Sequence, residues 1–397
     1  MTTPNKATEV ALKWVLSLRS GASSLDRTDD GPITVMGAAG PIGRTSKPNT
    51  RSGSTLIGRV GTVGAINLAR DDCWASDNVI VATPGPALES TYAYYLLKSA
   101  RLPELASKTA QPLLTASTVA GLRFTIPPLE EQRRIADFLD AETARIDQLI
   151  ALQKKLSSRL DERDHALRDN LVNELAGAAG ELQLRRFTTR IEQGASPQCE
   201  AIPRQGNDEW GVLKLSAVKG GHFAPSENKR LPEDIEAISA YQVRRGDLLV
   251  TRANTPSLVG DVAVVEGDHR KLLLPDLIYR VGLVPEMNAD FVAQVALSGR
   301  VRTLIESVAR GSSQSMVKLR GEDIKAWPMP VATRAQQATL VQEIHRGTQG
   351  TGRLRNAVAL QLSLLAERRQ ALITAAVTGQ IDVSTASGRN VMDGVSA

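Results

Sequence analysis

Hydrophobic residues between 130 and 176 recur mostly at intervals of three, four or seven positions, and charged residues fill the positions between them. This spacing predicts one amphipathic helix, because residues at these intervals lie on the same helical face. Pro127 and Pro128 mark its start, since proline is not tolerated inside a helix, and no glycine interrupts it before Gly177. At about 1.5 Å per residue the helix is roughly 70 Å long, so we expect it to need a partner along its length.

The helical segment occurs twice. The sequence IPPLEEQRRIADFL at 126–139 resembles MPVATRAQQATLV at 329–341, with Gln132 aligned to Gln337, 205 residues later. The same offset aligns LDERDHAL, which begins at Leu160, with LAERRQAL. We therefore expect a second long helix to follow the second copy of the motif.

Earlier positions also align, with offsets that drift as insertions accumulate. Asp77 aligns with Asp276 at an offset of 199, and the glycine of SGASS, residues 20–24, aligns with that of QGASP, residues 193–197, at 173. Solenoid repeats have periods of about 20–50 residues, so this interval indicates a duplicated and fused module instead. A fused duplication implies pseudo-twofold symmetry within the chain.

The second apolar stripe covers residues 337–378 and is predicted to pack antiparallel to the first helix. GTQGTG at 347–352 places three glycines in it, and each glycine costs about 1 kcal/mol relative to alanine, so we expect a break there. Ordinary helical packing is the alternative to a dedicated spacer between domains. The predicted core of the helix pair is Ile135, Leu139, Ile146, Leu149, Leu156, Leu160, Leu167, Leu340, Ile344, Leu354, Val358, Leu365 and Leu372.

The segments before the two helices, 1–125 and 181–327, have a different character. They are rich in glycine, proline and short β-branched runs, which are typical of twisted sheets with long loops. Helical stretches are predicted near 91–100 and 290–308. The fold class is therefore predicted to be α+β. The runs expected to form strands are 33–35, 55–57, 78–81, 247–250 and 262–265.

Composition limits the cellular setting more than the chemistry. The chain has 397 residues, enough for two or three domains, and only two cysteines, Cys73 and Cys199. Two cysteines exclude a disulfide framework and favour a reducing cytoplasm. The N-terminal segment lacks the apolar core of a signal peptide, and no uncharged apolar stretch approaches 18–20 residues, so no membrane span is expected.

The net charge of +5 is by itself weak support for nucleic-acid binding. Residues 130–176 contain 8 Lys/Arg and 11 Asp/Glu, whereas residues 331–397 contain 7 and 4. A DNA-facing surface must therefore arise by clustering in the folded chain. Aromatic residues make up only 4% of the chain, which disfavours single-strand binding by base stacking but not recognition of duplex grooves.

Several ordered motifs resemble the specificity (S) subunits of type I restriction–modification systems. PPLEEQRRIADFLD at 127–140 and AERRQALITAAVTGQID at 366–382 resemble the conserved regions of that family. The second motif has lost the Pro-Pro-Leu form and carries the glycine insertion. Further motifs resemble two classes of target recognition domain: VMGAAGPIG (35–43), GRVGTVGA (58–65), WASDN (74–78), GDLLVTRANTPSLVGD (246–261) and ARGSSQSMVKL (309–319).

The resemblance implies a non-catalytic subunit that recognises a split, asymmetric sequence in double-stranded DNA. It implies two recognition domains, separated and joined by two long antiparallel helices that form a coiled-coil spacer. Two methyltransferase (M) subunits and the restriction and translocase (R) subunits are the implied partners. S-adenosylmethionine, ATP and Mg²⁺ would serve those partners, and no cofactor or metal is implied for this chain.

The domain boundaries follow from the resemblance and the helix pattern. Residues 1–126 are predicted to form the first target recognition domain, and residues 127–179 the central spacer helix. Residues 180–328 are predicted to form the second recognition domain, and residues 329–383 the distal spacer helix. The polar tail at 384–397 is predicted to be disordered.

Candidate DNA-binding residues lie in glycine-rich and polar loops. Arginine is the commonest bidentate partner of guanine, and glycine lets a backbone approach a phosphate closely. Arg59 and Arg252 follow equivalent strands, 55–57 and 248–250, although a structural arginine bracing a loop is the alternative for each. The full candidate set is Arg44, Lys47, Arg51, Arg59, Thr62, Gln111, Lys214, Lys219, Arg252, Asn254, Ser257, Arg310, Ser312, Ser313 and Gln314.

The motifs of the obvious enzyme classes are missing. We find no methyltransferase Asn-Pro-Pro-aromatic motif, no Walker loop and no nuclease Glu-x-Lys after Pro275-Asp276. The four histidines are scattered without metal-ligand spacing. The competing function class is a two-headed coiled-coil scaffold that joins other proteins without recognising DNA.

Overall fold

The structure is a computed structural model that describes residues 8–23, 27–28, 30–107, 112–308, 310–313 and 316–383. Gln111, Gln314 and the tail at 384–397 lie outside the described residues, so the predictions for them stay predictions. The chain divides into two compact units. Unit 1 comprises Met1–Lys154 and Val358–Ala397, and unit 2 comprises Lys155–Ala357.

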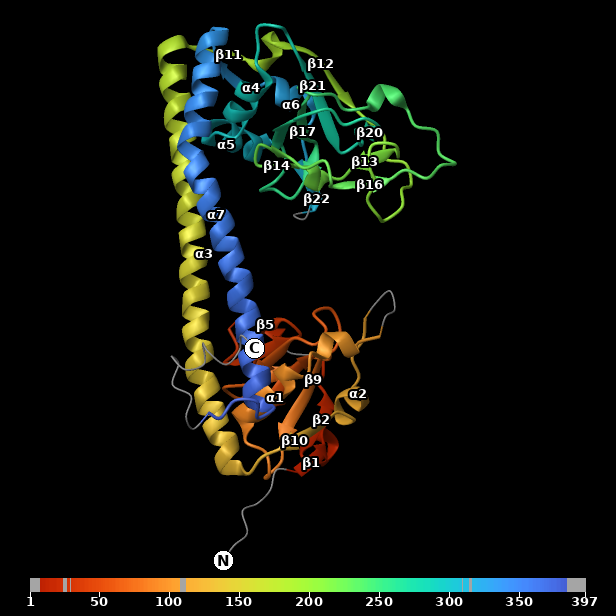
Figure 1. The fold of residues 1–397 in the computed structure, drawn as a ribbon, viewed down its shortest axis with the longest axis vertical. Helices are drawn as coiled ribbons and strands as arrows, with labels where there is room; N and C mark the ends of the chain where they lie inside the picture. The colour runs from red at the N-terminus through yellow and green to blue at the C-terminus, as the bar shows by residue number, and fades with distance from the viewer. Residues whose placement is uncertain are drawn as a thin grey trace, which may run out of the picture. The chain divides into compact units, whose positions relative to one another are not determined.

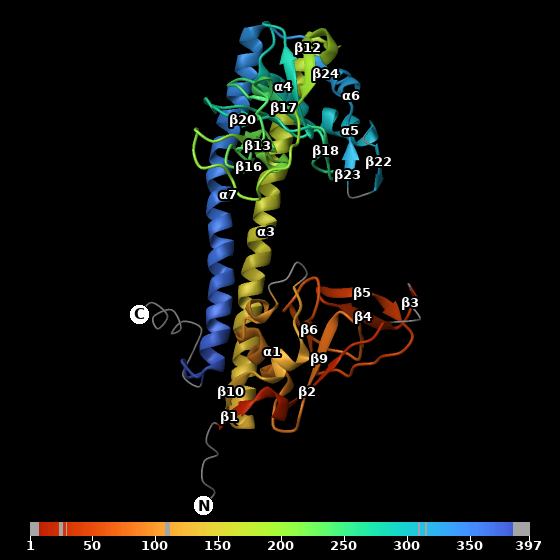
Figure 2. The same ribbon diagram turned by 90° about the vertical axis from the view of Figure 1, so that its right-hand side faces the viewer.

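Unit 1 contains two four-stranded sheets (Figure 2). The first is antiparallel, in the order β2 (Leu16–Ser20), β9 (Val79–Pro84), β6 (Thr55–Gly58) and β7 (Ile66–Leu68). The second has the order β3 (Arg27–Thr28), β5 (Gly40–Thr45), β4 (Ile33–Gly37) and β8 (Trp74–Ala75), and β4 and β8 are parallel. The remaining elements are the antiparallel pair β1 (Thr8–Ala11) and β10 (Arg123–Ile126), α1 (Ser90–Ser99), α2 (Ala116–Ala120), η1 (Leu12–Trp14) and η2 (Leu102–Leu105).

Unit 2 has the same central sheet, antiparallel in the order β12 (Thr188–Gln193), β21 (Ile278–Leu283), β17 (Leu248–Thr251) and β19 (Val262–Val264). Its second sheet has the order β16 (Asn228–Arg230), β13 (Gly211–Leu213) and β20 (Leu272–Leu273), with β13 and β20 parallel. Two smaller sheets are β14 (Val218–Lys219) with β15 (His222–Phe223), and β18 (Ala253–Asn254), β23 (Met316–Lys318) and β22 (Arg310–Ser313). The other elements are β11 (Glu181–Gln183) paired with β24 (Pro328–Pro330), α4 (Ala289–Ala296), α5 (Gly299–Val308), α6 (Gly321–Lys325), η3 (Leu184–Arg186), η4 (Leu215–Ala217) and η5 (Ser239–Tyr241).

The strand predictions are confirmed, because each β-branched run overlaps β4, β6, β9, β17 or β19, with at most one residue outside the strand. The helix predicted near 91–100 is α1, and the helical stretch predicted near 290–308 is also present. It divides into α4 and α5 around Ser298, whose hydroxyl donates to Val295 O at 2.6 Å. Asp169 Oδ1 then accepts a hydrogen bond from Gly299 N at 2.7 Å, which satisfies a free amide at the start of α5.

Both long helices are present. α3 runs from Leu129 to Ala179 and α7 from Arg334 to Val377. Unit 1 contains the first half of α3 and the second half of α7, and unit 2 contains the other two halves. Within each unit the two segments lie side by side and antiparallel, and α1 in unit 1 or α4 in unit 2 packs between them and the sheet (Figures 1 and 2).

The predicted break at 347–352 is wrong, because α7 continues through it. At Gly347 a Cβ atom would lie 2.3 Å from Leu167 Cδ2 of α3, so the missing side chain permits a close approach of the two helices. The buried Thr351 hydroxyl donates to Asp164 Oδ2 of α3 at 2.7 Å. Packing against α3 therefore offsets the low helix propensity of the glycines.

The predicted core of the helix pair needs three corrections. Leu149, Leu156 and Leu354 are exposed, at 47%, 44% and 52%. Buried and half-buried positions of α3 recur every three and four residues. One such series along α3 is Leu139, Thr143, Ile146, Ile150, Gln153, Ser157, Leu160 and Asp164. This series includes polar side chains and does not include Leu149 or Leu156. The other predicted core residues are buried or half-buried: Ile135, Leu139, Ile146, Leu160, Leu167, Leu340, Ile344, Val358, Leu365 and Leu372.

The repeated glutamines make the same three hydrogen bonds at the start of each long helix. In unit 1, Gln132 Oε1 accepts from Glu89 N at 2.7 Å, and its Nε2 donates to the carbonyls of Ala87 and Pro127 at 3.0 and 2.8 Å. In unit 2, Gln337 Oε1 accepts from Asn288 N at 2.8 Å, and its Nε2 donates to the carbonyls of Glu286 and Ala332 at 3.1 and 2.9 Å. Both side chains are 1% exposed. Each glutamine therefore ties a long helix to the segment that leads into α1 or α4.

Gln337→Ala is expected to lower the free energy of unfolding by about 1–3 kcal/mol, because it leaves a buried amide and two carbonyls without their partner. Urea denaturation followed by circular dichroism measures the change. The matched control is Gln342→Ala, an exposed glutamine on the same helix and in the same unit, which should change stability little. Equal effects of the two substitutions would contradict the role assigned to Gln337.

Candidate nucleic-acid interface

Arg59 and Arg252 occupy the same backbone position in the two units. Each directly follows one of the two inner strands of its central sheet, β6 or β17. Arg59 N donates to Asn78 O at 2.9 Å, and Arg59 O accepts from Leu114 N at 3.1 Å. The corresponding bonds of Arg252, to Leu277 O and from Leu319 N, measure 2.8 and 2.9 Å. The equivalence that the sequence alignment predicts is therefore present in the backbone.

A serine–aspartate pair lies beside each arginine. Ser23 donates to Asp77 Oδ2 at 2.8 Å in unit 1, and Ser196 donates to Asp276 Oδ1 in unit 2. Each aspartate immediately precedes the residue whose carbonyl accepts from the arginine amide, so the pair fixes the loop on which the arginine rests. The sequence search missed both serines as site residues, although the aligned SGASS and QGASP segments contain them.

The two guanidinium groups are available to a ligand to different degrees. The Arg252 guanidinium lies 5.9 Å from the centre of the Tyr279 ring, and its Nη1 is 3.5 Å from Asp276 O. Arg59 makes no side-chain hydrogen bond or ion pair with any residue that the structure describes. Both arginines are half-buried at the strand end and retain guanidinium donors for an external acceptor.

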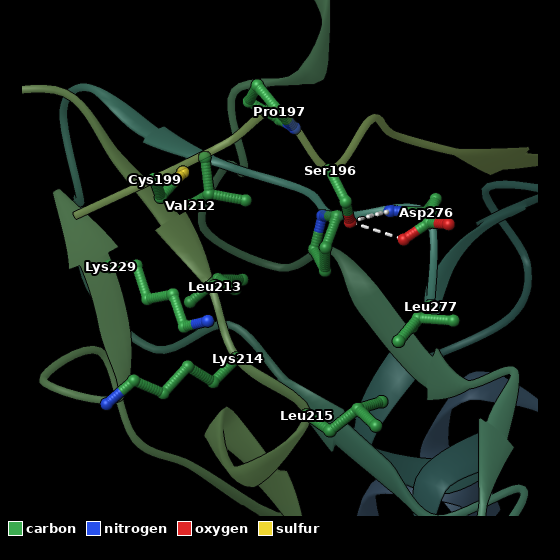
Figure 3. Close-up of a pocket in the computed structure, with 11 residues that line it drawn as sticks. Ser196, Pro197, Cys199, Val212, Leu213, Lys214, Leu215, Lys229, Asp276 and Leu277 are labelled. Carbon is green, nitrogen blue, oxygen red and sulfur yellow. Dashed lines mark hydrogen bonds between the residues drawn. The ribbon is translucent and has the colours of Figure 1, made fainter. Parts of the chain in front are cut away.

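A pocket of about 500 Å³ adjoins Asp276 in unit 2 (Figure 3). Val212, Leu213 and Leu277 contribute apolar side chains to its lining, and two lysines stand at one side of it. The lysines are Lys214, whose Nζ lies 3.8 Å from Glu227 Oε2, and Lys229. Burial raises the pKa of the Cys199 thiol in this pocket, and the charge of Lys229 opposes that shift. Since Glu227 pairs with Lys214 and Asp276 also lines the pocket, Lys229 is the cation left, among the described residues of the lining, to attract an anionic ligand.

Further candidates of unit 2 lie at the same end of β17. Lys219 precedes Gly220, whose amide donates to both carboxylate oxygens of Asp261 at 2.9 Å. Burial raises the pKa of Asp261, although the amides of Gly220 and Val262 oppose the shift. Since Thr251 N donates to Asp261 O at 2.8 Å, this contact places Lys219 near the strand end that carries Arg252.

The small sheet β18-β23-β22 brings a further group of candidates together. Asn254, two residues after Arg252, pairs with Val317 of the central strand β23, and the other side of β23 pairs with β22, the strand that contains Arg310, Ser312 and Ser313. Only the backbone of this last strand belongs to the described part of the chain. Asn254 Oδ1 accepts from Thr255 N at 2.9 Å, and Ser257 is exposed in the loop that follows.

The candidates of unit 1 do not form one cluster. Thr62 is exposed in the β6–β7 turn beside Arg59. Arg44 uses its guanidinium within its own unit, donating to Gly31 O at 2.5 Å and Pro32 O at 3.3 Å. Lys47 is exposed in the loop after β5, and Arg51 lies in the turn that precedes β6, at the opposite end of that strand from Arg59.

The described ranges give no support for a metal site or a membrane-spanning helix. No group of three or more His, Cys, Asp or Glu residues there is arranged to hold a metal ion. Within the same ranges, no helix combines the length and apolar character needed to cross a membrane.

One family model matches part of the chain. Residues 13–161 match the Type I restriction modification DNA specificity domain. The EcoEI specificity subunit of Escherichia coli is 30% identical over 155 residues, which cover 39% of this chain and 26% of that protein. The EcoKI specificity subunit of Escherichia coli strain K12 is 23% identical over 238 residues, covering 57% and 50%. The chain therefore spans half or less of these curated relatives.

A solved structure has the same fold. Its description reads "Structural basis underlying complex assembly and conformational transition of the type I R-M system". The likeness has a TM-score of 0.59 at 16% sequence identity and covers 96% of this chain and 100% of that one. At this identity the likeness establishes the mixed α/β fold alone.

Proposed function

We propose that this chain, a member of the family of type I restriction–modification specificity subunits, recognises a double-stranded DNA target in two separate parts. The observation that carries the proposal is the arginine site that occurs once in each unit, at the end of β6 and of β17. Loops surrounding these arginines differ between the units, so each unit would recognise a different part of the target. The chain would contribute recognition but no catalysis.

The chemistry of the two sites suits duplex DNA. A guanidinium presents a planar fork of donors that matches a phosphate or the major-groove edge of guanine. Because the arginine occupies the same place in both units while neighbouring loops differ, it would contact the phosphate backbone, which is common to every sequence. The differing loops around Thr62 and Asn254 would then contact base edges.

The two units would be copies of one ancestral module, related by pseudo-twofold symmetry. The shared strand order, the glutamine contacts of both long helices and the paired arginine sites support this interpretation. The 51 residues of α3 correspond to a helix of roughly 75 Å, more than two turns of B-DNA. We propose that α3 and α7 form an antiparallel coiled-coil spacer that sets the gap between the two parts of the target.

Catalysis would belong to partner subunits. Two methyltransferase subunits would bind S-adenosylmethionine, and restriction and translocase subunits would use ATP and Mg²⁺. An adenine can react only after it leaves the base stack, and this chain would position the pocket that receives it. The competing scaffold function predicts no salt-dependent affinity for duplex DNA.

Arg59→Ala and Arg252→Ala test the recognition site. Each is expected to weaken binding to cognate and unrelated duplexes by a similar factor, and to reduce the slope of log affinity against log salt by about one, because one phosphate contact is lost. Fluorescence anisotropy with the methyltransferase partner present measures both quantities. Arg245→Ala is the matched control, because that exposed arginine lies before β17, at the other end of the strand.

Three results are decisive. Loss of affinity in both arginine variants, with the control unchanged, supports the proposal. An unchanged salt slope would show that neither guanidinium contacts a phosphate. Salt-independent affinity of the unmodified chain would favour the scaffold function instead.

A further inference from the structure

Ion pairs join the two long helices, and in the pairs described below the acidic residue is always on α3. In unit 1, Arg369 of α7 holds Asp147 of α3 with two contacts, Nε to Oδ1 at 3.0 Å and Nη2 to Oδ2 at 3.3 Å. In unit 2, Arg355 of α7 donates to Asp164 of α3, Nη2 to Oδ2 at 2.7 Å. The carboxylate lies on α3 and the guanidinium on α7 in both pairs.

The second pair is the more enclosed of the two. The Asp164 side chain is 6% exposed and also accepts from the Thr351 hydroxyl of α7. Arg355 Nε lies 2.7 Å from Asp161 Oδ1, a charge contact that adds a second α3 carboxylate. A buried carboxylate is stable only with such partners, because desolvation opposes its charge.

The repeat makes the two pairs comparable. The offset that aligns Gln132 with Gln337 aligns Asp164 with Arg369, so equivalent positions carry opposite charges. It also places Asp147 at the level of Gly352, between Thr351 and Arg355, the two residues that contact Asp164. Each unit therefore has a contact between α3 and α7 at corresponding places in the repeat. In both contacts the carboxylate lies on α3 and the guanidinium on α7.

The charge of the whole helices follows the same division. α3 contains 11 Asp and Glu against 8 Lys and Arg, and α7 contains six arginines against two glutamates. The apolar residues of the contact do not distinguish α3 from α7, because both helices contribute buried aliphatic side chains. Examples are Leu139 and Leu160 of α3 and Val358 and Leu372 of α7. Charge is the property that distinguishes one helix from the other.

Pairing of like helices would bring like charges together. In an antiparallel pair of two α3 helices from two copies, the same geometry sets Asp147 of each copy against Asp164 of the other. In a pair of two α7 helices, Arg369 would lie beside Arg355 of the other copy. Pairing of two α3 helices leaves the buried Asp164 without a guanidinium partner, whereas α3 with α7 gives Asp147 and Asp164 an arginine each.

We propose that the polarity of these two ion pairs makes α3 and α7 selective for each other and opposes association of two chains through like helices. The partner that the contact face of α3 fits is a helix with basic residues at the positions of Arg355 and Arg369. This selectivity does not depend on DNA recognition. It matters most before α7 has been synthesised, when the apolar face of α3 has no partner within its chain.

The test uses the full chain with one pair reversed, Asp147→Arg with Arg369→Asp. The reversed pair can still form within unit 1, but α3 now carries a positive charge at position 147 and keeps the negative charge of Asp164. Position 147 of one copy is then complementary to Asp164 of a second copy in an antiparallel pair of α3 helices. Chains are unfolded in denaturant and refolded by dilution over a range of concentrations, and light scattering after gel filtration gives the dimer fraction. The matched control, Asp147→Glu with Arg369→Lys, keeps the original polarity.

The reversed chain is expected to show a dimer association constant about tenfold higher than the unmodified chain and the control, because two repulsive contacts become attractive. Equal dimer fractions in all three chains would overturn the proposal. If the reversed chain does not refold, the single variants decide. Thermal midpoints lowered by Asp147→Arg and by Arg369→Asp but not restored in the double variant would show that the ion pair does not join the helices, which also overturns it.

Discussion

Arg280→Ala is expected to lower the free energy of unfolding of unit 2 by about 3–5 kcal/mol, the cost of removing one partner of a buried ion pair. The Arg280 side chain is 9% exposed and lies between Glu192 Oε2 at 2.9 Å and Asp247 Oδ2 at 3.3 Å. It also donates to the carbonyls of Gln242 and Ala240 at 2.9 and 3.0 Å. Its loss leaves two carboxylates and two carbonyls without their shared donor.

Arg190→Ala is the matched control, because Arg190 pairs with the same Glu192 at 3.4 Å while 63% of its side chain is exposed. Exposed pairs contribute only about 0–1 kcal/mol, since water screens them. Urea denaturation, with a fluorescence probe placed in unit 2, compares the two variants. Similar losses of stability would show that burial does not set the contribution of Arg280.

Lengthening the spacer is expected to change the recognised target itself. Seven residues inserted after Lys154 in α3, and seven after Ala357 in α7, add two helical turns to each, or about 10.5 Å. At roughly 3.4 Å per base pair, the gap between the two parts of the target should grow by about three base pairs. Sites with the original gap should lose about 10³-fold or more in affinity, down to the level of unrelated sequence.

Sequencing of methylated DNA, with the methyltransferase partner supplied, measures the new gap. The control is the same seven residues inserted after Gly206, in an exposed loop of unit 2 that belongs to neither helix. An unchanged gap in the doubly lengthened chain would refute the spacer function of α3 and α7.

The sequence predicted the existence and extent of both long helices because their signals are local. Apolar spacing, the paired prolines and the absence of glycine from 130 to 176 depend on no distant contact. The expected break at 347–352 failed for the opposite reason. Helix propensity is a weak local term, and the contacts of Gly347 and Thr351 with α3 could not be deduced from the sequence alone.

Which residues of α3 face α7 was only partly predictable from the sequence. Choosing the largest apolar residues selected Leu149 and Leu156, whereas the continuous three-and-four spacing passes through Gln153, Ser157 and Asp164. Polar residues in a helix contact become recognisable only when their partners are known. Asp164 has such a partner in Arg355, which is 191 residues away in the chain.

Within the candidate site, the alignment of two strand ends located Arg59 and Arg252, because an internal repeat supplies a comparison that one copy cannot give. The same approach would have identified Ser23 and Ser196. The scattered cations of unit 1 were less predictable, since loop composition does not show which end of a strand a side chain occupies. Arg44 donates hydrogen bonds within its own unit, and Arg51 lies at the opposite end of β6 from Arg59.

Genome-wide mapping of methylated adenines, in a strain with and without this gene, tests the central claim most directly. The account predicts a set of sites that depends on the gene and shares one asymmetric sequence in two parts, separated by a gap of constant length. Gene-dependent sites with one continuous sequence, or no difference between the two strains when the methyltransferase partner is expressed, would contradict it.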